Sequence, residues 1–373
     1  MSRIFLAGDV MTGRGVDQIL RHPSLPAIQE PVIRDARAYV ALAEAVNGPI
    51  PGQVGDTYVW GDALEELDRV APAARVVNLE TSVTRSDEAW PKGINYRMHP
   101  ANVGCLTAAR FDVCGLANNH ILDYGYAGLV ETMETLTHAG LKVVGAGRDQ
   151  EEAFRPARIP LGDGRGLVVF AIGSETAGIP ACWATSATRP GVALLQDLSE
   201  ATAVAILDRV ARAKGPGDLL VATVHWGSNW GYAVPREYVR FAHWLIDGGV
   251  DLVHGHSSHH PRPIEVYADR LILYGCGDFI HDYEGIGGYE EFRNDIVLMY
   301  FAALGSAGDL VDLRMMPMQV KRMRLHRASS EDAAWLARLL TQLSTPFGTR
   351  VRLADDGIGT LLLEQDPRGS TES

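Results

Sequence analysis

The chain carries a dense group of potential metal ligands and proton carriers between residues 251 and 282. Five of its twelve histidines fall there, interleaved with carboxylates; the group is His254, His256, His259, His260, His281, Glu265, Asp278 and Asp282. Imidazole and carboxylate side chains at this density are typical of metal binding or proton transfer. The alternative for any single member is a buried structural histidine or a surface residue.

The sequence predicts that buried strands position these residues. Residues 250–253 are apolar and lead into Gly255, and residues 271–274 lead into the Gly275–Asp278 turn. Similar apolar runs occur at residues 3–7, 76–79, 113–116, 142–144, 167–172 and 219–224. Helical periodicity over residues 126–139 and 235–247 alternates with them, which predicts an α/β fold with ligands at the carboxyl ends of the strands.

Polar side chains follow several of these strands. This pattern is expected when the ends of parallel strands form one reactive edge of a sheet. Oxygen ligands are available from Asp9, Glu80 and Asn119, and nitrogen ligands from His225, His256 and His259. Carboxylates and amides suit hard cations, whereas imidazoles shift the preference toward transition metals. The residues therefore predict a divalent cation site, with Mn²⁺, Ca²⁺ and Mg²⁺ as the candidate ions.

Composition limits the possible partners. Acidic residues outnumber basic ones by 46 to 34, so we expect no nucleic-acid partner. The N-terminus lacks the apolar core of a signal peptide, and no apolar run is long enough to span a bilayer, so we expect no membrane association and a cytoplasmic location. The four cysteines lack metal-binding spacing, which favours reduced packing residues.

The chain is predicted to form one large domain over residues 1–328. A segment rich in Pro, Ala and Gly at residues 23–61 reads as an insertion that carries a helix. Residues 329–373 are expected to add a C-terminal helix capped by Ser329 or Ser330, followed by a polar tail.

Seven ordered motifs give the chain a specific resemblance to a known family. They are GDVM at 8–11, NLETS at 78–82, LANNHILDYG at 116–125, VGAGR at 144–148, HWG at 225–227, GHSSHH at 255–260 and YGCGDF at 274–279. In this order they resemble the CapA family of capsule and poly-γ-glutamate synthesis, over roughly residues 1–320. The resemblance extends to calcineurin-like metallophosphoesterases, and it implies a four-layer αββα sandwich with a metal centre at the strand ends.

The resemblance also implies roles for individual residues. Asp9, Glu80, Asn119, His225, His256 and His259 stand at metal-ligand positions of the family pattern. His120 falls where phosphoesterases keep an acid–base histidine, and Asp123 is close enough to orient it. The chain departs from the calcineurin-type pattern at Met11, where a histidine ligand is usual, which favours one well-held ion over a dinuclear centre.

Cationic and aromatic residues near these motifs indicate how a substrate could be held. Arg14, Lys92 and Arg97 could bind a carboxylate or phosphate, and Trp230 could form part of an aromatic wall. The alternatives are solvation at the surface for the cations and core packing for the tryptophan.

Two reaction classes fit a metal ion surrounded by histidines and carboxylates. Soluble CapA-like proteins resemble enzymes that invert the C-terminal residue of a lasso-type precursor peptide, so the leading hypothesis is a metal-dependent peptide epimerase with a peptide substrate. One acid–base group would be His120 with Asp123, and the opposed group would come from His281, His256, Asp278 and Asp282. The alternative is a metal-dependent phosphoesterase or other hydrolase, or a CapA-type component of poly-γ-glutamate or capsule synthesis.

Overall fold

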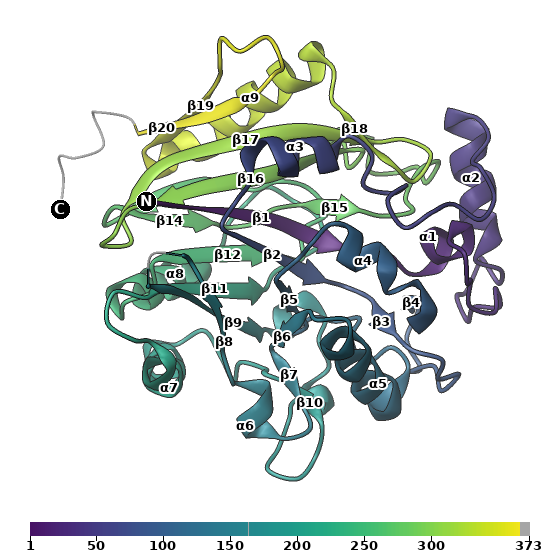
Figure 1. The fold of residues 1–373 in the computed structure, drawn as a ribbon, viewed down its shortest axis with the longest axis horizontal. Helices are drawn as coiled ribbons and strands as arrows, with labels where there is room; N and C mark the ends of the chain where they lie inside the picture. The colour runs from purple at the N-terminus through teal and green to yellow at the C-terminus, as the bar shows by residue number, and fades with distance from the viewer. Residues whose placement is uncertain (163, 366–373) are drawn as a thin grey trace.

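Two large β-sheets form the centre of the molecule in this computed structural model, which describes residues 1–162 and 164–365 (Figure 1). The first sheet has the strand order β19-β20-β17-β16-β1-β2-β5-β6, with β15 paired to β1 and β18 paired to β17. Its strands are β1 (Ser2–Val10), β2 (Ala74–Leu79), β5 (Val113–Gly115), β6 (Lys142–Val144), β15 (Asp278–Ile280), β16 (Ile296–Leu304), β17 (Leu310–Val320), β18 (Leu325–Arg327), β19 (Thr349–Leu353) and β20 (Leu361–Gln365).

The second sheet has the order β13-β14-β12-β11-β9-β8. Its strands are β8 (Ala157–Pro160), β9 (Gly166–Gly173), β11 (Leu219–His225), β12 (Leu252–His256), β13 (Ile264–Tyr267) and β14 (Arg270–Leu273). The four inner strands are parallel and the two edge strands antiparallel. Short pairs lie outside the two sheets: β3 (Ser82–Val83) with β4 (Arg97–Met98), and β7 (Ala146–Gly147) with β10 (Gly191–Val192).

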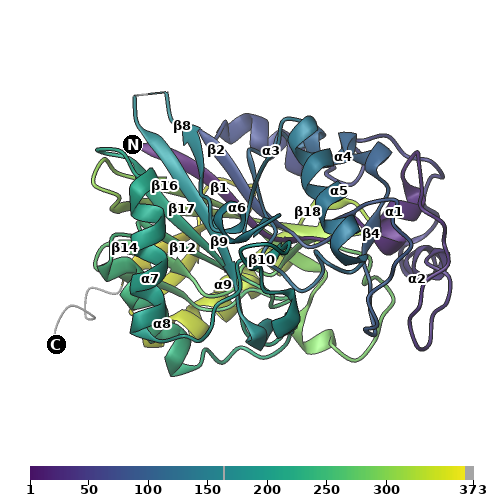
Figure 2. The same cartoon turned by 90° about the horizontal axis from the view of Figure 1, so that it is seen from below.

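Helices cover the outer faces of both sheets (Figures 1 and 2). The α-helices are α1 (Arg14–Ile19), α2 (Arg37–Asn47), α3 (Ala63–Val70), α4 (Gly104–Ala108), α5 (Gly125–His138), α6 (Gln150–Ala153), α7 (Glu200–Val210), α8 (Arg236–Asp247) and α9 (Ser330–Ser344). The 3-10 helices are η1 (Pro100–Asn102), η2 (Glu175–Ala177), η3 (Ala181–Trp183), η4 (Ala211–Ala213), η5 (Glu290–Phe292) and η6 (Thr345–Phe347).

Alternation along the strands builds three apolar layers. On β1, Ile4 and Leu6 face the core between the two sheets, which they share with Val221 of β11. The intervening Phe5 packs on the other face, in the core that includes residues of α3, α4 and α5. A third core joins the outer face of the second sheet to α7 and α8. Because strand side chains alternate between faces, both central sheets are buried on two sides, and the predicted four-layer αββα sandwich is confirmed.

The parallel strands bring their carboxyl ends to one edge. β1 runs parallel to β2 and β15, and β11 runs parallel to β12 in the other sheet. In Figure 1, β1, β11 and β12 point toward the same end of the molecule, where α1, α2 and β4 also lie. The arrangement places the polar residues that follow these strands around one region, as the sequence predicts.

The C-terminal segment is more than a helix with a polar tail. Helix α9 starts after Ser329, whose side chain accepts a hydrogen bond from the Asp332 N–H, as predicted. Beyond the helix, β19 and β20 pair with each other and join the first sheet through β17. Residues 366–373 lie outside the described part of the chain, and a domain boundary at residue 328 remains a prediction.

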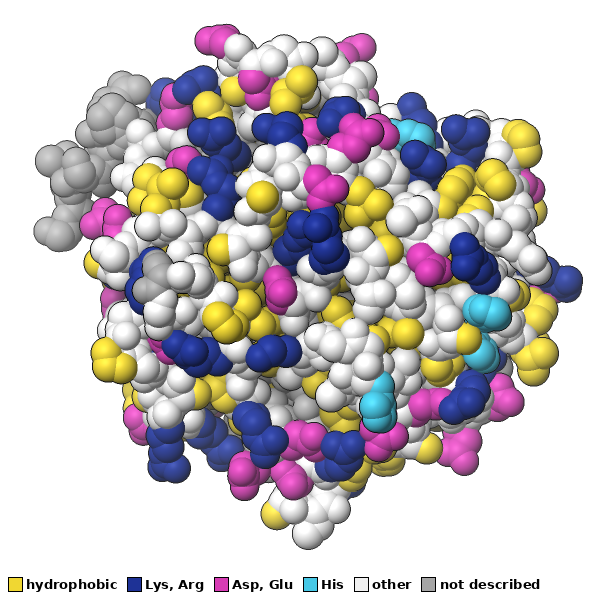
Figure 3. Space-filling model, in the orientation of Figure 1, with side chains coloured by type: hydrophobic (Ala, Val, Ile, Leu, Met, Phe, Trp, Pro, Cys, Tyr) yellow, Lys and Arg dark blue, Asp and Glu magenta, His cyan; other side chains and the backbone are white. Residues whose placement is uncertain are grey.

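The surface carries both signs of charge. On the face that bears α3, α4 and α5, Lys and Arg side chains are interspersed with Asp and Glu (Figure 3). Within residues 1–162 and 164–365, the structure contains no helix with the length and apolar character that crossing a bilayer requires.

Candidate metal centre

Asp9, at the carboxyl end of β1, is the central residue of the site. Its side chain is completely buried, and its carboxylate accepts hydrogen bonds from Asn78 Nδ2 at 2.7 Å and from the Ser257 N–H at 3.2 Å. The preceding residue must be glycine, because a Cβ at Gly8 would lie 1.7 Å from the carbonyl oxygen of Gly277. Glycine therefore permits the close approach of β1 and β15 that sets Asp9 beside Asp278.

Asp278 and His259 form one side of the site. Register pairs Asp278 with Asp9 across the two parallel strands. Asp278 Oδ1 lies 2.8 Å from His259 Nδ1, whereas the buried Asp278 Oδ2 has no hydrogen-bond partner. Asp278, expected as a proton carrier, thus joins Asp9 and His259 in a group whose ligand atoms all lie within 4.8 Å of one another.

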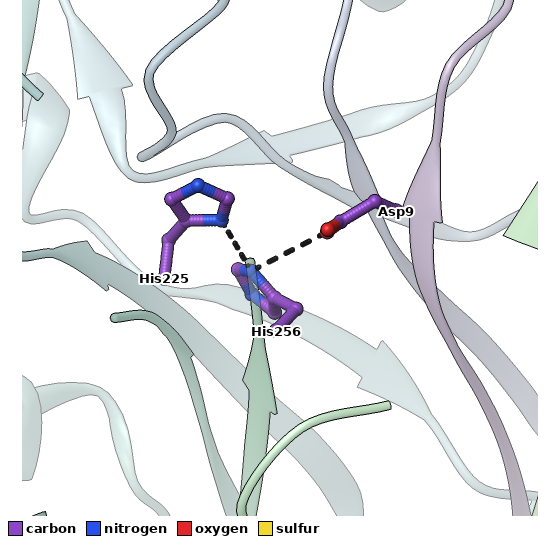
Figure 4. Close-up of side chains that lie close together, drawn as sticks. All are labelled: Asp9, His225 and His256. Carbon is purple, nitrogen blue, oxygen red and sulfur yellow. Dashed lines mark hydrogen bonds and ion pairs between the residues drawn. The ribbon is translucent and has the colours of Figure 1, made fainter. Parts of the chain in front are cut away.

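His225 and His256 form the other side (Figure 4). They end the paired strands β11 and β12, in register with each other, and their Nδ1 atoms are 2.8 Å apart. His256 Nδ1 lies 3.8 Å from Asp9 Oδ1. Asp9, His225 and His256 form a second group of ligand atoms within 4.8 Å of one another. The two groups share Asp9, so the cluster contains two candidate cation positions, and the single well-held ion expected from Met11 stays a prediction.

The electrostatics of the cluster fit divalent cations. Burial and the neighbouring Asp278 raise the pKa of Asp9 to about 7, and burial with the neighbouring Asp9 raises the pKa of Glu80 well above its usual value. Burial lowers the pKa of His225 and His256, which keeps these imidazoles neutral and able to coordinate. Crowded buried carboxylates, an orphaned oxygen on Asp278 and neutral imidazoles are a donor set that a cation would stabilise.

Glu80 and Asn119 extend the cluster from the first sheet. Glu80 follows β2, and Asn78 Nδ2 lies 3.5 Å from its carboxylate. Asn119 Oδ1 lies 3.0 Å from His225 Nε2, which connects the loop after β5 to the end of β11. With these contacts, all six residues predicted as metal ligands lie in one region.

His120 lies beside the cluster with a defined tautomer. Its Nδ1 is 2.6 Å from Asp123 Oδ2, and because a carboxylate accepts, Nδ1 carries the proton. Its Nε2 lies 3.7 Å from Glu80 Oε1 and is the ring nitrogen that faces the cluster. Burial lowers the pKa of His120 to about 4. Lys92 is held by the same Asp123, with Nζ 2.6 Å from Oδ1.

The opposed acid–base partner expected from His281 and Asp282 is not brought to His120. His281 Nε2 bonds to the carbonyl oxygen of Asn294 at 2.9 Å, and its Nδ1 accepts the Tyr283 N–H at 3.1 Å. Both ring nitrogens are therefore occupied. Asp282 is an ion-pair partner of Arg14, at 2.5 Å and 2.8 Å.

The three cations expected to hold a substrate anion are all paired within the protein. Arg14 is 3% exposed and bonds Asp282 and Glu30. Lys92 pairs with Asp123, and Arg97 pairs with Asp87 at 2.6 Å. Sequence spacing could not show these pairings. Asp282 and Asp123 lie far along the chain from Arg14 and Lys92, and Asp87 lies ten residues before Arg97.

Trp230 belongs to an aromatic group beside the site. Its ring stacks on Tyr289 at 4.0 Å and lies 5.3 Å from the His259 ring. Tyr283, a neighbour of His259, donates a hydrogen bond to Met11 Sδ at 3.5 Å. Met11, which stands where the calcineurin-type pattern led us to expect a histidine, thus contacts Tyr283.

Sequence reasoning missed three residues around the cluster. Asn78 is the hydrogen-bond donor nearest to Asp9, and its place at the end of a strand was the available signal. Ser257 binds Asp9 through its backbone N–H with a φ of 98°, which nothing in the residue type indicates. Arg262 is buried near the site, and the sequence offered no signal for its environment.

The fold and the cluster define a class of protein: an α/β sandwich whose strand ends carry a buried histidine–carboxylate centre able to hold divalent cations. Comparison with known families is more specific. The model of the bacterial capsule synthesis protein family PGA_cap matches residues 3–283, and the chain belongs to this family.

Two relatives found by sequence agree with this assignment. The chain is 49% identical over 358 residues to the probable polyglutamine synthesis accessory protein MT0602 of Mycobacterium tuberculosis (strain CDC 1551 / Oshkosh), covering 95% of this chain and 94% of that protein. It is 25% identical over 282 residues to the capsule biosynthesis protein CapA of Bacillus anthracis, covering 74% and 59%. A solved 5'-nucleotidase precursor from Thermus thermophilus shows a TM-score of 0.47 and 14% identity, covering 85% of this chain and 54% of that one.

These relatives overturn the leading hypothesis of a peptide epimerase. A relative similar over 95% of the chain is named for polyglutamine synthesis. The matching family model and a second relative are named for capsule synthesis, and none of the three is named for isomerisation or lasso-peptide maturation. Two histidines of the 251–282 group already have partners in the protein: His281 bonds to the backbone and His259 bonds Asp278. The alternative that named a CapA-type component of polymer synthesis agrees with the comparisons.

Proposed function

We propose that this protein is an accessory component of the synthesis of a glutamate polymer, and that its histidine–carboxylate cluster binds divalent cations and hydrolyses a bond in that polymer or its precursor. The supporting observation is the 49% identity, across 95% of the chain, to a relative named for polyglutamine synthesis. The choice of glutamate over glutamine rests on the resemblance of the seven motifs to the CapA family of poly-γ-glutamate synthesis. The buried cluster around Asp9 supports a catalytic rather than purely structural contribution, because it combines ligands with an adjacent proton carrier.

Asp9, Asp278 and His259 would hold one cation, and Asp9, His225 and His256 a second. Glu80 and Asn119 lie close enough to complete the shells. A bound divalent ion supplies Lewis acidity, which activates water and stabilises negative charge on oxygen. We infer Mn²⁺ as the preferred ion over Ca²⁺ and Mg²⁺, because the donor set includes three imidazoles.

His120 would move the proton. Its Nδ1–H is fixed on Asp123, so its Nε2 is the atom that exchanges a proton with a leaving group. Lys92 holds Asp123 from the other side, and the Tyr96 ring packs edge-on against His120 at 4.6 Å. These contacts keep the imidazole in one orientation and exclude water from one of its faces.

A genetic experiment tests the role in polymer synthesis. Deleting the gene in the bacterium that carries it should lower the glutamate released by acid hydrolysis of purified envelope polymer. Wild-type protein should restore the polymer, whereas Asp9→Asn should not. Unchanged polymer content in the deletion strain would refute the proposed role, and full restoration by Asp9→Asn would refute a catalytic contribution of the cluster.

The hydrolytic step is tested separately with purified protein and Mn²⁺. Incubation with γ-linked polyglutamate should create new amino ends, and a chelator should stop their release. His120→Asn should retain the bound ion and lose most of the activity, about a hundredfold or more. No new ends at any metal concentration would refute hydrolysis of this polymer.

A further inference from the structure

A short loop beside the metal centre covers two buried polar side chains that lack expected partners. The loop comprises residues 227–232 and links β11 to α8. Gly227 and Gly231 have φ values of 81° and 104°, which only glycine adopts without strain. Ser228 and Asn229 form its exposed crest.

Arg262 lies under this loop without a counter-ion. It is 2% exposed, and within the described part of the chain its guanidinium donates to one residue, Ser228, to the carbonyl oxygen at 2.7 Å and the hydroxyl at 3.1 Å. Its Nε atom is buried with no hydrogen-bond partner. Among the described residues, no acidic side chain lies within ion-pair distance of Arg262. A buried cation without an anion is costly, whereas Arg14, Lys92 and Arg97 each have one.

His260, two residues earlier, is the second such group. It is 1% exposed, and its Nδ1 donates to the carbonyl oxygen of Pro261 at 3.1 Å. The remaining nitrogen, Nε2, is buried and unpartnered, and in the neutral ring it is an acceptor. The imidazole stacks on Phe292 at 4.7 Å and meets the edge of Tyr232 at 4.6 Å. Flat aromatic faces around a free acceptor suit a planar N–H group such as an amide.

The loop connects both groups to the metal centre. Ser257 donates its hydroxyl to the carbonyl oxygen of Gly227 at 3.1 Å and its N–H to Asp9 at 3.2 Å. The N–H of His259 donates to the carbonyl oxygen of Asn229 at 3.0 Å. A chain bound under the loop would therefore continue directly to the cluster of ligands.

We propose that Arg262 and His260 form a recognition subsite for an acidic, amide-linked chain: Arg262 binds a carboxylate, His260 accepts an amide N–H, and the loop of residues 227–232 lifts to admit them. The carboxylate neutralises Arg262, and it replaces the contacts to Ser228 with a stronger charge-assisted pair. The inference rests on the proposed function only for the choice of polyglutamate as the ligand.

Binding to the purified, full-length, metal-free protein tests the subsite. The probes are a short γ-linked oligoglutamate, its methyl ester, and inorganic phosphate, each titrated by calorimetry. The free acid should bind and the ester should bind about tenfold more weakly or not at all, because it lacks the charge. Equal binding of acid and ester would overturn the assignment of Arg262, and tighter binding of phosphate would overturn a carboxylate-chain subsite.

Variants assign the residues. Arg262→Met should weaken oligoglutamate binding about tenfold or more, and His260→Phe, which keeps the stack but removes the acceptor, should weaken it severalfold. Arg240→Met removes an exposed cation of α8, and His326→Phe removes another imidazole whose buried Nε2 has no partner. Neither substitution should change the affinity. Wild-type affinity in both Arg262→Met and His260→Phe would refute the subsite.

Two further measurements keep the test decisive if Arg262→Met does not fold. Arg262→Lys, which retains the charge but not the fork of donors, should bind the acid more weakly than wild type and still discriminate against the ester. In the wild-type protein, oligoglutamate should change hydrogen exchange in residues 227–232 and leave β19 unchanged. No change in the loop would refute its opening. These results do not depend on polymer content in cells, so failure of the subsite and failure of the proposed function are separable.

Discussion

Replacing Arg14 separates a structural role from a role in substrate binding. Arg14 has a φ of 51° at the start of α1, and its guanidinium lies 3.6 Å from the centre of the Tyr39 ring. Its partners, Asp282 and Glu30, are as buried as Arg14 itself, with side-chain exposures of 0%, 6% and 2%. The pairing connects residues 23–61, which include Glu30 and Tyr39, to the segment that follows β15.

The magnitude follows from this burial. Removing one partner of a buried ion pair costs about 3–5 kcal/mol, because the remaining charge is left in a poorly solvated place. Asp282 keeps the Gly15 N–H at 2.8 Å and Glu30 keeps the Tyr39 hydroxyl, so the lower part of that range applies. We expect Arg14→Met to lower the free energy of unfolding by about 3 kcal/mol.

Urea unfolding, followed by tryptophan fluorescence and circular dichroism, measures this loss. The double variant Arg14→Met/Asp282→Asn should be more stable than the sum of the single losses implies, by about 1–3 kcal/mol, since the uncompensated carboxylate is gone. Exposed Arg37→Met, which breaks a surface pair with Asp35, should change stability far less than Arg14→Met does. A loss under about 1 kcal/mol in Arg14→Met, combined with weakened oligoglutamate binding, would refute the structural role.

The remaining predictions concern the ions, a buried histidine and a positioning lysine. Asp9→Asn should lose ions from both positions, and His225→Ala should lose an ion from one. Elemental analysis after dialysis against Mn²⁺ measures the bound metal. Equal losses in the two variants would contradict the sharing of Asp9. Burial lowers the pKa of His254 from 6.5 to about 4, so its contribution to stability is complete above pH 6.5 and is lost as the pH falls toward 4. Between pH 7 and pH 4, the free energy of unfolding should therefore fall by about 3 kcal/mol less in His254→Gln than in the wild-type protein. An equal fall in both proteins would refute burial as the cause. Lys92→Met should lower the free energy of unfolding by about 1–2 kcal/mol, because Asp123 loses its cation. Lys92→Arg should recover most of this stability. An unchanged free energy of unfolding in Lys92→Met would show that the pair is not stabilising.

The candidate metal ligands could be selected from the sequence because each lies at, or a few residues after, the carboxyl end of a strand. Apolar runs identified β1, β2, β5, β11 and β12 within a few residues, and parallel strands deliver their carboxyl ends to one edge. The antiparallel half of the first sheet was not predicted. Strand β16 is apolar throughout, and β17, β19 and β20 mix apolar with polar residues. No candidate metal ligand was recognised in any of them, so nothing drew attention to these segments.

The pairing of charged residues was not predictable. Asp282 looked like a proton carrier beside His281, yet it lies opposite Arg14, which is 268 residues away along the chain. Asp278 looked like part of the same reactive pair, but the parallel register of β15 with β1 sets it beside Asp9. Sequence neighbours in an extended segment point to opposite faces, and long-range contacts decide what each face meets.

By itself, the sequence determined the α/β fold class, the family motifs and the set of candidate ligands, because hydrophobic periodicity and strand-end positions are local properties. Only the tertiary structure decided which of these residues act together. It joined Asp9 to Asp278 and His256 and neutralised Arg14 with Asp282. Within residues 1–162 and 164–365, it left Arg262 buried without an anionic partner. The electrostatic state of a side chain depends on groups distant in sequence and on exclusion of water, and neither exists until the two sheets have packed.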